Sequence, residues 1–257
     1  MTSPASTSIL ITGATGAIGS ALAVHYARVG VHLYLQGRNI QLLQQTANQC
    51  RAAGAQVTEC QYDLCDRAAL KLWLDDVLSE QVPDLVFANA GMNIDTGVDQ
   101  AGESWDATEQ LLELNVRATF YLTHRLALAM KEQGKGQIVL ISSLAAWFGL
   151  PVTPAYSASK AAVKAYGEGL RGWLKPCGVL VTVVMPGYVR SPMCDAMPGP
   201  KPFLWQPVQA ARHIATKVAL GRARISFPFP LNFGSWWLAV LPAGLAHRLV
   251  RLFGYGG

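Results

Sequence analysis

The sequence predicts an α/β fold, a doubly wound sandwich in which helices cover both faces of a parallel sheet of about seven strands. Short β-rich runs alternate with longer amphipathic stretches from the N-terminus onward. Several of the short runs are apolar throughout, as expected of strands that are buried on both faces. The length of 257 residues suits one domain of this kind with a large core.

The elements can be placed in order from the hydrophobic pattern. Strands are predicted at residues 8–12, 32–36, 56–61, 84–88, 137–141 and 179–184. Helices are predicted near residues 17–29, 39–53, 66–79, 104–132 and 155–174. Right-handed crossovers between such strands place a ligand at their carboxyl ends.

A glycine-rich turn, Thr12-Gly13-Ala14-Thr15-Gly16-Ala17-Ile18-Gly19, joins the first strand to the first helix. Residues without a Cβ let the backbone approach a pyrophosphate, and the helix N-terminus offers free N–H groups and a positive dipole end. Because βαβ units follow this junction, the turn predicts dinucleotide binding by a Rossmann-type fold. The expected cofactor contacts in the turn are Gly13, Thr15, Gly16, Ile18 and Gly19.

The end of the second strand, Gln36-Gly37-Arg38-Asn39, indicates which cofactor binds. An acid here would accept hydrogen bonds from the adenosine ribose hydroxyls, but none is present. Gly37 leaves room for a phosphate, which the planar guanidinium of Arg38 can bind. The sequence therefore favours NADP(H) over NAD(H), and the alternative for Arg38 is a solvated residue at a helix start.

Two later loops lie at the same edge of the predicted sheet. Asp63, followed by Leu64, comes after the third strand and is placed either to contact the adenine amino group or to cap the next helix. The turn Asn89-Ala90-Gly91 after the fourth strand would lie beside the cofactor. These five residues complete the first half of the expected cofactor site.

Tyr156 and Lys160 are four residues apart, which on a helix places them one turn apart on the same face. A tyrosine with a pKa near 10 is a poor acid-base catalyst at neutral pH, and a nearby lysine favours the phenolate. Ser143 ends the preceding strand, where its hydroxyl could hold a substrate carbonyl oxygen against the phenol. The pattern predicts a proton-transfer site.

Together with the nucleotide turn, these residues resemble the short-chain dehydrogenase/reductase family, in order along residues 8–193. The matching pieces are residues 12–19, Asn89-Ala90-Gly91, Asn115, Ser143, Tyr156 with Lys160, and residues 186–193. The resemblance implies a catalytic tetrad in which Tyr156 donates or accepts the proton and Lys160 lowers the Tyr156 pKa and binds the nicotinamide ribose. It also implies that Ser143 orients the substrate and that Asn115 holds a water in a proton relay.

The resemblance further implies that the stretch after the sixth strand cradles the nicotinamide amide, with Pro186, Gly187, Val189 and Ser191 as cofactor contacts. Two departures from the family pattern are visible. The usual turn T-G-x-x-x-G-x-G here has Ala17 at its middle glycine and Gly16 one place early. Ser191 stands where threonine is commoner and keeps the hydroxyl. The first departure affects how the turn would contact the cofactor phosphates in detail.

The C-terminal region differs from the rest in charge and hydropathy. Residues 195–257 carry a net charge of +6 against −1 for residues 1–194, and the 22 residues from Ile225 to Ala246 carry no charge. Prolines within this block argue against a membrane-spanning helix. Two interpretations stay open: a last strand at 225–229 followed by a surface that packs on a partner subunit or over the active site, or a peripheral membrane contact through residues 225–251.

Residues 1–193 thus form the predicted dinucleotide-binding and catalytic core, and residues 194–257 the substrate lid, last strand and basic apolar segment of the same domain. The mean hydropathy of +0.23 is consistent with a homo-oligomer interface or a membrane-facing surface. Basic residues interleaved with apolar ones disfavour nucleic acid. The five scattered cysteines predict neither disulfides nor a metal site, and the absence of a secretory pattern predicts a cytoplasmic protein.

These observations predict an NADP(H)-dependent oxidoreductase that moves hydride between nicotinamide and the carbonyl or secondary alcohol carbon of an apolar substrate, with ketone reduction favoured. One alternative is an NAD-linked alcohol dehydrogenase, which an acid at position 37 would have favoured. Another is a non-catalytic nucleotide-sensing protein. Such a protein would not need Ser143, Tyr156, Lys160 and Asn115 together.

Overall fold

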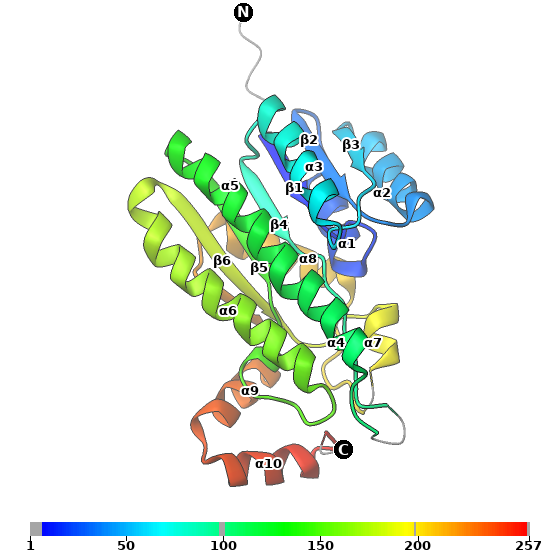
Figure 1. Ribbon diagram of the computed structural model, residues 1–257, viewed down its shortest axis with the longest axis vertical. Helices are drawn as coiled ribbons and strands as arrows, with labels where there is room; N and C mark the ends of the chain where they lie inside the picture. Colours follow the sequence, from blue (N-terminus) through cyan, green and yellow to red (C-terminus); the bar gives the residue numbers. More distant parts are fainter. Residues whose placement is uncertain (1–6, 98–100, 198, 256–257) are drawn as a thin grey trace, which may run out of the picture.

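The computed structural model describes residues 7–97, 101–197 and 199–255. Its centre is a parallel sheet of seven strands in the order β3-β2-β1-β4-β5-β6-β7 (Figure 1). The strands are β1 (Thr7–Ile11), β2 (Val31–Gln36), β3 (Gln56–Cys60), β4 (Leu85–Ala88), β5 (Gly136–Ile141), β6 (Val179–Pro186) and β7 (Arg224–Phe227). The predicted doubly wound α/β fold is confirmed.

Helices cover both faces of this sheet. One face carries α1 (Ala17–Tyr26), α2 (Ile40–Ala52) and α8 (Pro207–Ala219). The other carries α3 (Arg67–Glu80), α5 (Thr119–Gln133) and α6 (Pro154–Leu174). Buried side chains on each side of the sheet form separate clusters with these helices, including Leu22 and Ile214 on the first face and Trp73 and Leu170 on the second. This two-sided burial explains why strands such as β4 are apolar throughout.

Capping residues place the helix starts beside the carboxyl ends of the strands. The Asn39 side chain accepts a hydrogen bond from the Leu42 N–H at the start of α2. Asp66 does the same for the Ala69 N–H at the start of α3. Each satisfies a backbone donor that the first helical turn leaves without a partner. The α2 and α3 starts are thereby fixed at the edge of the sheet where the sequence predicts the cofactor.

The helix predicted over residues 104–132 is confirmed, and it contains a π-helical segment that the sequence pattern did not predict. It consists of α4 (Trp105–Leu112), a π-helical segment η1 (Glu113–Ala118) and α5. The extra residue per turn of a π segment changes which side chains face the sheet, and such segments occur frequently at functional sites. Asn115 lies in this segment.

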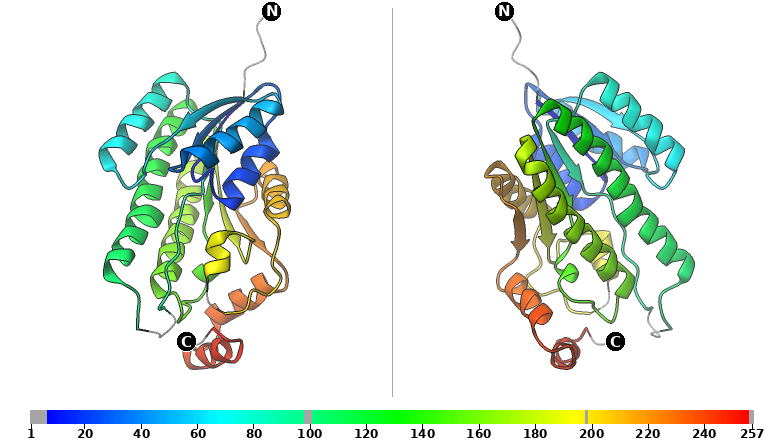
Figure 2. Two further views of the ribbon diagram at one scale, coloured as in Figure 1. Left: turned by 90° about the vertical axis from the view of Figure 1, so that its right-hand side faces the viewer. Right: turned by 60° about the vertical axis from the view of Figure 1, so that its left-hand side comes forward.

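The C-terminal region holds the last strand and four helices that the sequence pattern did not place. These are α7 (Pro192–Ala196), α8, α9 (Leu231–Val240) and α10 (Ala243–Leu252). The strand predicted at 225–229 runs from Arg224 to Phe227 and ends where Pro228 removes a backbone donor. Figure 2 shows α9 and α10, in orange and red, beyond the carboxyl ends of the strands. Within the described residues, no helix is both long and apolar enough to cross a bilayer.

Candidate active site

The glycine turn is built around two close backbone approaches. Gly13 has a left-handed φ of +64°, and a Cβ there would lie 2.9 Å from Ala90 Cα. A Cβ at Gly19 would lie 2.2 Å from the Gly13 carbonyl oxygen. Glycine is therefore required at both positions. Gly16 caps α1 without a side-chain hydrogen bond, which leaves the N-terminus of this helix open to an anion.

Side chains from three strands hold this turn in place. The Gly13 N–H donates to Gln36 Oε1 at 3.0 Å. Asn89 Nδ2 donates to the carbonyl oxygens of Thr12 and Gly13, and Thr12 Oγ1 accepts from the Asn89 and Ala90 N–H groups. Asn89 therefore supports the turn as well as lying beside it. The sequence argument did not assign this supporting role to Thr12 or Gln36, although both are polar residues at strand ends.

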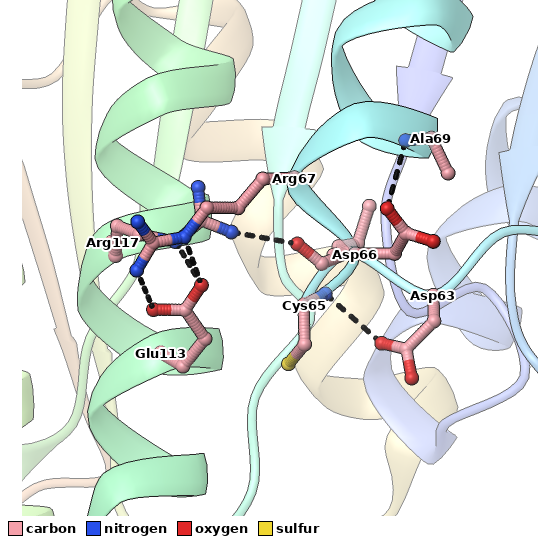
Figure 3. Close-up of polar contacts among 8 residues, drawn as sticks. Asp63, Cys65, Asp66, Arg67, Ala69, Glu113 and Arg117 are labelled. Atoms are coloured by element: carbon pink, nitrogen blue, oxygen red, sulfur yellow. Dashed lines mark hydrogen bonds and ion pairs between the residues drawn. The ribbon is translucent and has the colours of Figure 1, made fainter.

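Arg38 lies at the open edge of the site. Its Nη1 is 3.9 Å from Asp63 Oδ2, and both side chains are largely exposed. The other Asp63 oxygen accepts from the Cys65 N–H, so Asp63 also caps the turn that precedes α3 (Figure 3). A Cβ at Gly37 would lie 2.5 Å from Thr15 Cγ2. The glycine at 37, which lines the cavity beside Arg38, therefore also makes room for Thr15.

Ser143, Tyr156 and Lys160 come together where β5 ends beside the start of α6. Ser143 Oγ accepts from the Ala145 N–H at 3.1 Å, which fixes the serine at the start of the following 3-10 turn, η2 (Leu144–Ala146). Lys160 Nζ is 5.6 Å from the centre of the Tyr156 ring and donates to the Ile141 carbonyl oxygen at 3.1 Å. Ser142 Oγ donates to the Lys160 carbonyl oxygen at 2.7 Å and ties α6 to β5.

Burial sets the protonation of this group. Desolvation lowers the pKa of Lys160 to about 8. It raises the pKa of Tyr156, although a hydrogen bond with Ser143 acts in the opposite direction. The net direction for Tyr156 is thus opposite to that expected from Lys160 alone, because the cost of burying a phenolate dominates. At neutral pH the phenol therefore holds its proton.

Asn115 supports the site from behind. Its Oδ1 accepts from the Met92 N–H at 2.8 Å, and its Nδ2 donates to the Met92 carbonyl oxygen and to Ser159 Oγ. A Cβ at Gly91 would lie 3.1 Å from Asn115 Oδ1 and 3.2 Å from Lys160 Nζ. Gly91 therefore allows the amide and the ammonium to approach the backbone from two sides.

An ionic cluster links the helix of Asn115 to the loop after β3 (Figure 3). Glu113 pairs with Arg67 at the start of α3 and with Arg117 one turn further along its own helix. Arg117 Nη2 also donates to the Leu64 carbonyl oxygen at 3.2 Å. Burial alone would raise the pKa of Glu113, but the two guanidinium groups outweigh it and hold the pKa below its ordinary value. The carboxylate therefore stays ionised and fixes the π segment against α3.

The stretch after β6 folds back across the site. The Gly187 N–H donates to the Phe227 carbonyl oxygen at 2.7 Å, which anchors the turn to β7. Val189 forms a bridge with Trp205. Ser191 Oγ accepts from the Cys194 N–H at 3.0 Å and caps α7. The hydroxyl expected to contact the cofactor thus also starts the short helix α7.

One cavity of about 1150 Å³ joins these parts. Most of the predicted site residues line it, namely Gly13, Thr15, Gly16, Ile18, Arg38, Asp63, Leu64, Asn89, Ala90, Gly91, Ser143, Tyr156, Lys160, Pro186, Gly187, Val189 and Ser191. Ala17 also lines it, so the turn accommodates the methyl that replaces the middle glycine. Gly19 and Asn115 are not part of the lining, but Gly19 packs against Gly13 and Asn115 lies beside Gly91, and both of these glycines line the cavity.

Much of the opposite wall of this cavity comes from residues 194–257, the segment predicted as the substrate lid, although its individual lining residues were not predicted. Apolar residues from α9, α10 and the two segments after β5 and β6 form it, among them Leu150, Met193, Leu231, Trp237, Leu249 and Val250. In α10 the buried Ala246 and Val250 and the lining Leu249 and Phe253 follow helical spacing, which was a usable signal. In α9 no charged residue marks an outer face, so no such pattern is visible.

Comparisons with known proteins agree with this geometry. Residues 7–199 match the family model described as short chain dehydrogenase. An uncharacterized oxidoreductase of Myxococcus xanthus is 32% identical over 244 residues, which cover 94% of this chain and 95% of that protein.

Two solved structures share the fold. A short-chain dehydrogenase from Sphingobium yanoikuyae in complex with NADPH has a TM-score of 0.81 at 25% identity, with 95% of each chain covered. A short chain dehydrogenase from Mycobacterium paratuberculosis bound to NAD has a TM-score of 0.76 at 22% identity, covering 88% of this chain and 98% of that one. The glycine turn, the Ser143, Tyr156 and Lys160 group and these matches lead to one conclusion. The chain belongs to the short-chain dehydrogenase/reductase family of oxidoreductases.

Proposed function

We propose that this oxidoreductase uses NADP(H) to interconvert a bulky apolar ketone and its secondary alcohol, with reduction as the favoured direction. The observation that carries the proposal is the single cavity. It contains the glycine turn and Arg38 on one side, Ser143 and Tyr156 in the middle, and an apolar wall on the other. A dinucleotide and an apolar carbonyl compound would therefore meet at Tyr156.

The residues of the turn fit a dinucleotide. The α1 N-terminus has no side-chain cap, and Gly13 and Gly16 bring the backbone to the cavity surface. Exposed Arg38 supports the choice of NADP(H), because it lines the cavity just after the second strand and its guanidinium is 3.9 Å from the Asp63 carboxylate, too far for a close hydrogen bond. When bound, the nicotinamide supplies or accepts the hydride.

The side chains of this chain divide the remaining work. Tyr156 donates its proton to the carbonyl oxygen, and Ser143 donates a hydrogen bond to the same oxygen. Lys160 is held by the Ile141 carbonyl oxygen one turn from Tyr156, where it binds the nicotinamide ribose and returns a proton to the phenol. Asn115 fixes the Met92 main chain beside Gly91 and Lys160, the place where a relay water would bind.

Substrate choice follows from the wall opposite Tyr156. Leu150, Met193, Leu231, Trp237 and Leu249 give this side of the cavity few groups that could pair with substrate hydroxyls. Apolar substrate surface would gain about 25 cal/mol for each Å² buried here, whereas a sugar would lose hydrogen bonds to water. A bulky aromatic or aliphatic ketone suits the wall better than a polyol.

Oxidation of NADPH, followed by absorbance, tests the proposal with acetone, benzophenone and fructose as substrates. We expect kcat/KM to be highest for benzophenone and higher with NADPH than with NADH. Turnover of fructose in preference to benzophenone would overturn the apolar substrate class. Equal kcat/KM with NADH would overturn the cofactor choice, and reaction only with secondary alcohols and NAD⁺ would favour the alternative of an alcohol dehydrogenase.

A further inference from the structure

The outer face of α9 carries an exposed aromatic cluster. Phe233, Trp236 and Trp237 are 52%, 39% and 44% exposed, and their ring centres lie between 5.3 and 6.0 Å apart. Val240 continues this face, and Phe229 precedes the helix with 78% of its surface exposed. Leu245 and Leu252 add exposed apolar area on α10. Exposed apolar surface of this extent on α9 and α10 indicates an interaction site.

The charged side chains of α9 and α10 are all basic. Asp195 is the last acidic residue in the sequence, so α9 and α10 contain none, and exposed Arg248 and Arg251 lie on α10. His247 shares that polar side of α10. The aliphatic side of α10 with Ala246 and Val250 is buried, and on its outer side the exposed Leu245 and Leu252 lie one turn from Arg248. Basic and apolar side chains exposed together in this way are suited to the boundary between headgroups and acyl chains of an anionic bilayer.

The exposed cluster is continuous with the cavity. Phe233, Trp237 and Phe253 line the cavity and are also partly exposed. A molecule in the headgroup region could therefore reach the cavity past these three side chains without first crossing bulk water. The two helices have 10 residues each, too short to span a bilayer but long enough to lie in its surface.

We propose that the α9–α10 hairpin, residues 231–252 with Phe229, docks the enzyme on an anionic lipid surface and that the cavity takes its substrate from that surface. The docking part of this proposal depends only on the exposed residues and not on the proposed function. The step in which the substrate leaves the bilayer rests on the proposed ketone reductase function. A second copy of this chain is a poorer occupant of the face, because pairing two hairpins would bring Arg248 and Arg251 of both copies together without an acid to neutralise them.

Co-sedimentation of the full chain with vesicles tests the docking. The vesicles contain phosphatidylcholine alone or phosphatidylcholine with phosphatidylserine, at low and at high salt. We expect binding only to the mixed vesicles, weakening as salt rises. Each arginine contributes about fivefold in affinity, so an Arg248→Gln, Arg251→Gln variant should bind about 25-fold less tightly.

One doubly substituted apolar variant separates the hairpin from the rest of the surface. Phe229 and Trp236 lie outside the cavity lining, so Phe229→Ser with Trp236→Ser should remove vesicle binding and leave reduction of a soluble ketone unchanged. The matched controls are Trp105→Ser, an exposed tryptophan on α4, and Arg28→Gln, an exposed arginine after α1. Both should bind vesicles as the wild type does. Circular dichroism checks that each variant is folded.

Failure of the wild type to sediment with the mixed vesicles at low salt would overturn the proposal. Equal binding by the wild type and the hairpin variants would also overturn it, because another surface would then hold the lipid. A wild-type dimer that the Phe229→Ser, Trp236→Ser variant dissociates would assign the face to a second copy instead. Docking without any NADPH oxidation would leave the hairpin assignment standing and contradict the proposed function alone.

Discussion

At the scale of single residues, the site depends on a lysine whose charge is expensive to bury. Lys160 is 5% exposed, and its ammonium donates a hydrogen bond to the Ile141 carbonyl oxygen. Its pKa falls from 10.5 to about 8 because burial disfavours the ammonium. The unfolded chain therefore binds this proton more tightly than the folded one between pH 8 and 10.5, and stability from this group rises with pH across that window.

Replacing Lys160 with methionine should remove the cost of burying its ammonium. The free energy of unfolding of Lys160→Met at pH 7 should exceed that of the wild type by up to about 3 kcal/mol. Loss of the hydrogen bond to the Ile141 carbonyl oxygen reduces this gain. The stability gap between the two proteins should shift in favour of the wild type as the pH approaches 10.5. Urea unfolding at a series of pH values measures it, and a gap that does not change with pH would contradict the burial argument.

Tyr156 is expected to donate the proton without holding the nucleotide. Tyr156→Phe should therefore lower kcat by about 10²–10⁴-fold and leave the Kd for NADPH nearly unchanged. Ser143→Ala should also lower kcat, through loss of the hydrogen bond to the carbonyl oxygen. Steady-state initial rates give kcat, and fluorescence titration gives the Kd for NADPH. Wild-type turnover by Tyr156→Phe would show that another group supplies the proton.

Arg38 should read the phosphate that distinguishes the two cofactors. Arg38→Ala should weaken NADPH binding by about 10–100-fold and NADH binding much less, since charged hydrogen bonds of this type contribute about 1.5–3 kcal/mol each. Arg28→Ala is a matched control, because Arg28 is exposed and outside the cavity lining. Equal weakening of both cofactors by Arg38→Ala would mean that Arg38 does not contact the phosphate.

At the scale of elements, the sequence predicted the alternation of strands and helices up to β6, because buried strands and amphipathic helices leave strong periodic signals. The π segment at Glu113–Ala118 was not predictable in this way, since its sequence continues a helical pattern and only tertiary contacts select the wider turn. Asn115, which lies in this turn, is hydrogen-bonded to the Met92 main chain. Its position as a support behind the cavity, rather than in the lining, could therefore not be derived from spacing.

The Glu113 cluster allows a test of whether the π segment positions the site. Glu113→Gln should lower stability by about 1 kcal/mol and also lower kcat, because Arg117 loses its partner and Asn115 shares its helix. Asp75→Asn is the matched control: Asp75 bridges Lys71 and Arg125 on the same side of the sheet but far along α3 from the site. It should lower stability similarly without lowering kcat. An equal effect of both variants on kcat would indicate a merely structural role for Glu113.

At the scale of the whole molecule, the C-terminal hairpin lies outside the two large buried clusters and is joined to the sheet at the start of α9, where Leu231 packs on Val183 and Met185 and Asn232 donates to Ser226. The two large clusters of buried residues contain side chains from the sheet and its covering helices, and none from α9 or α10. The sequence indicated a change of character after residue 194 but not this arrangement, because uncharged α9 shows no amphipathic pattern and α10 is too short for its pattern to fix a partner. The separation suggests that the hairpin can be released while the sheet stays folded.

A charge placed on the buried side of α10 should detach this helix from the rest of the protein. Val250 is 2% exposed and lines the cavity, so an aspartate there would lose its hydration without gaining a partner. A helix of 10 residues that packs outside the main core cannot offset several kcal/mol. We expect Val250→Asp to expose residues 231–252 to protease and to raise KM for benzophenone more than for acetone, while the midpoint of cooperative unfolding changes little. Gly244→Asp, an aspartate at an exposed position of the same helix, should leave all three measurements unchanged. A large fall in the unfolding midpoint for Val250→Asp alone would show instead that the hairpin and the sheet unfold as one unit.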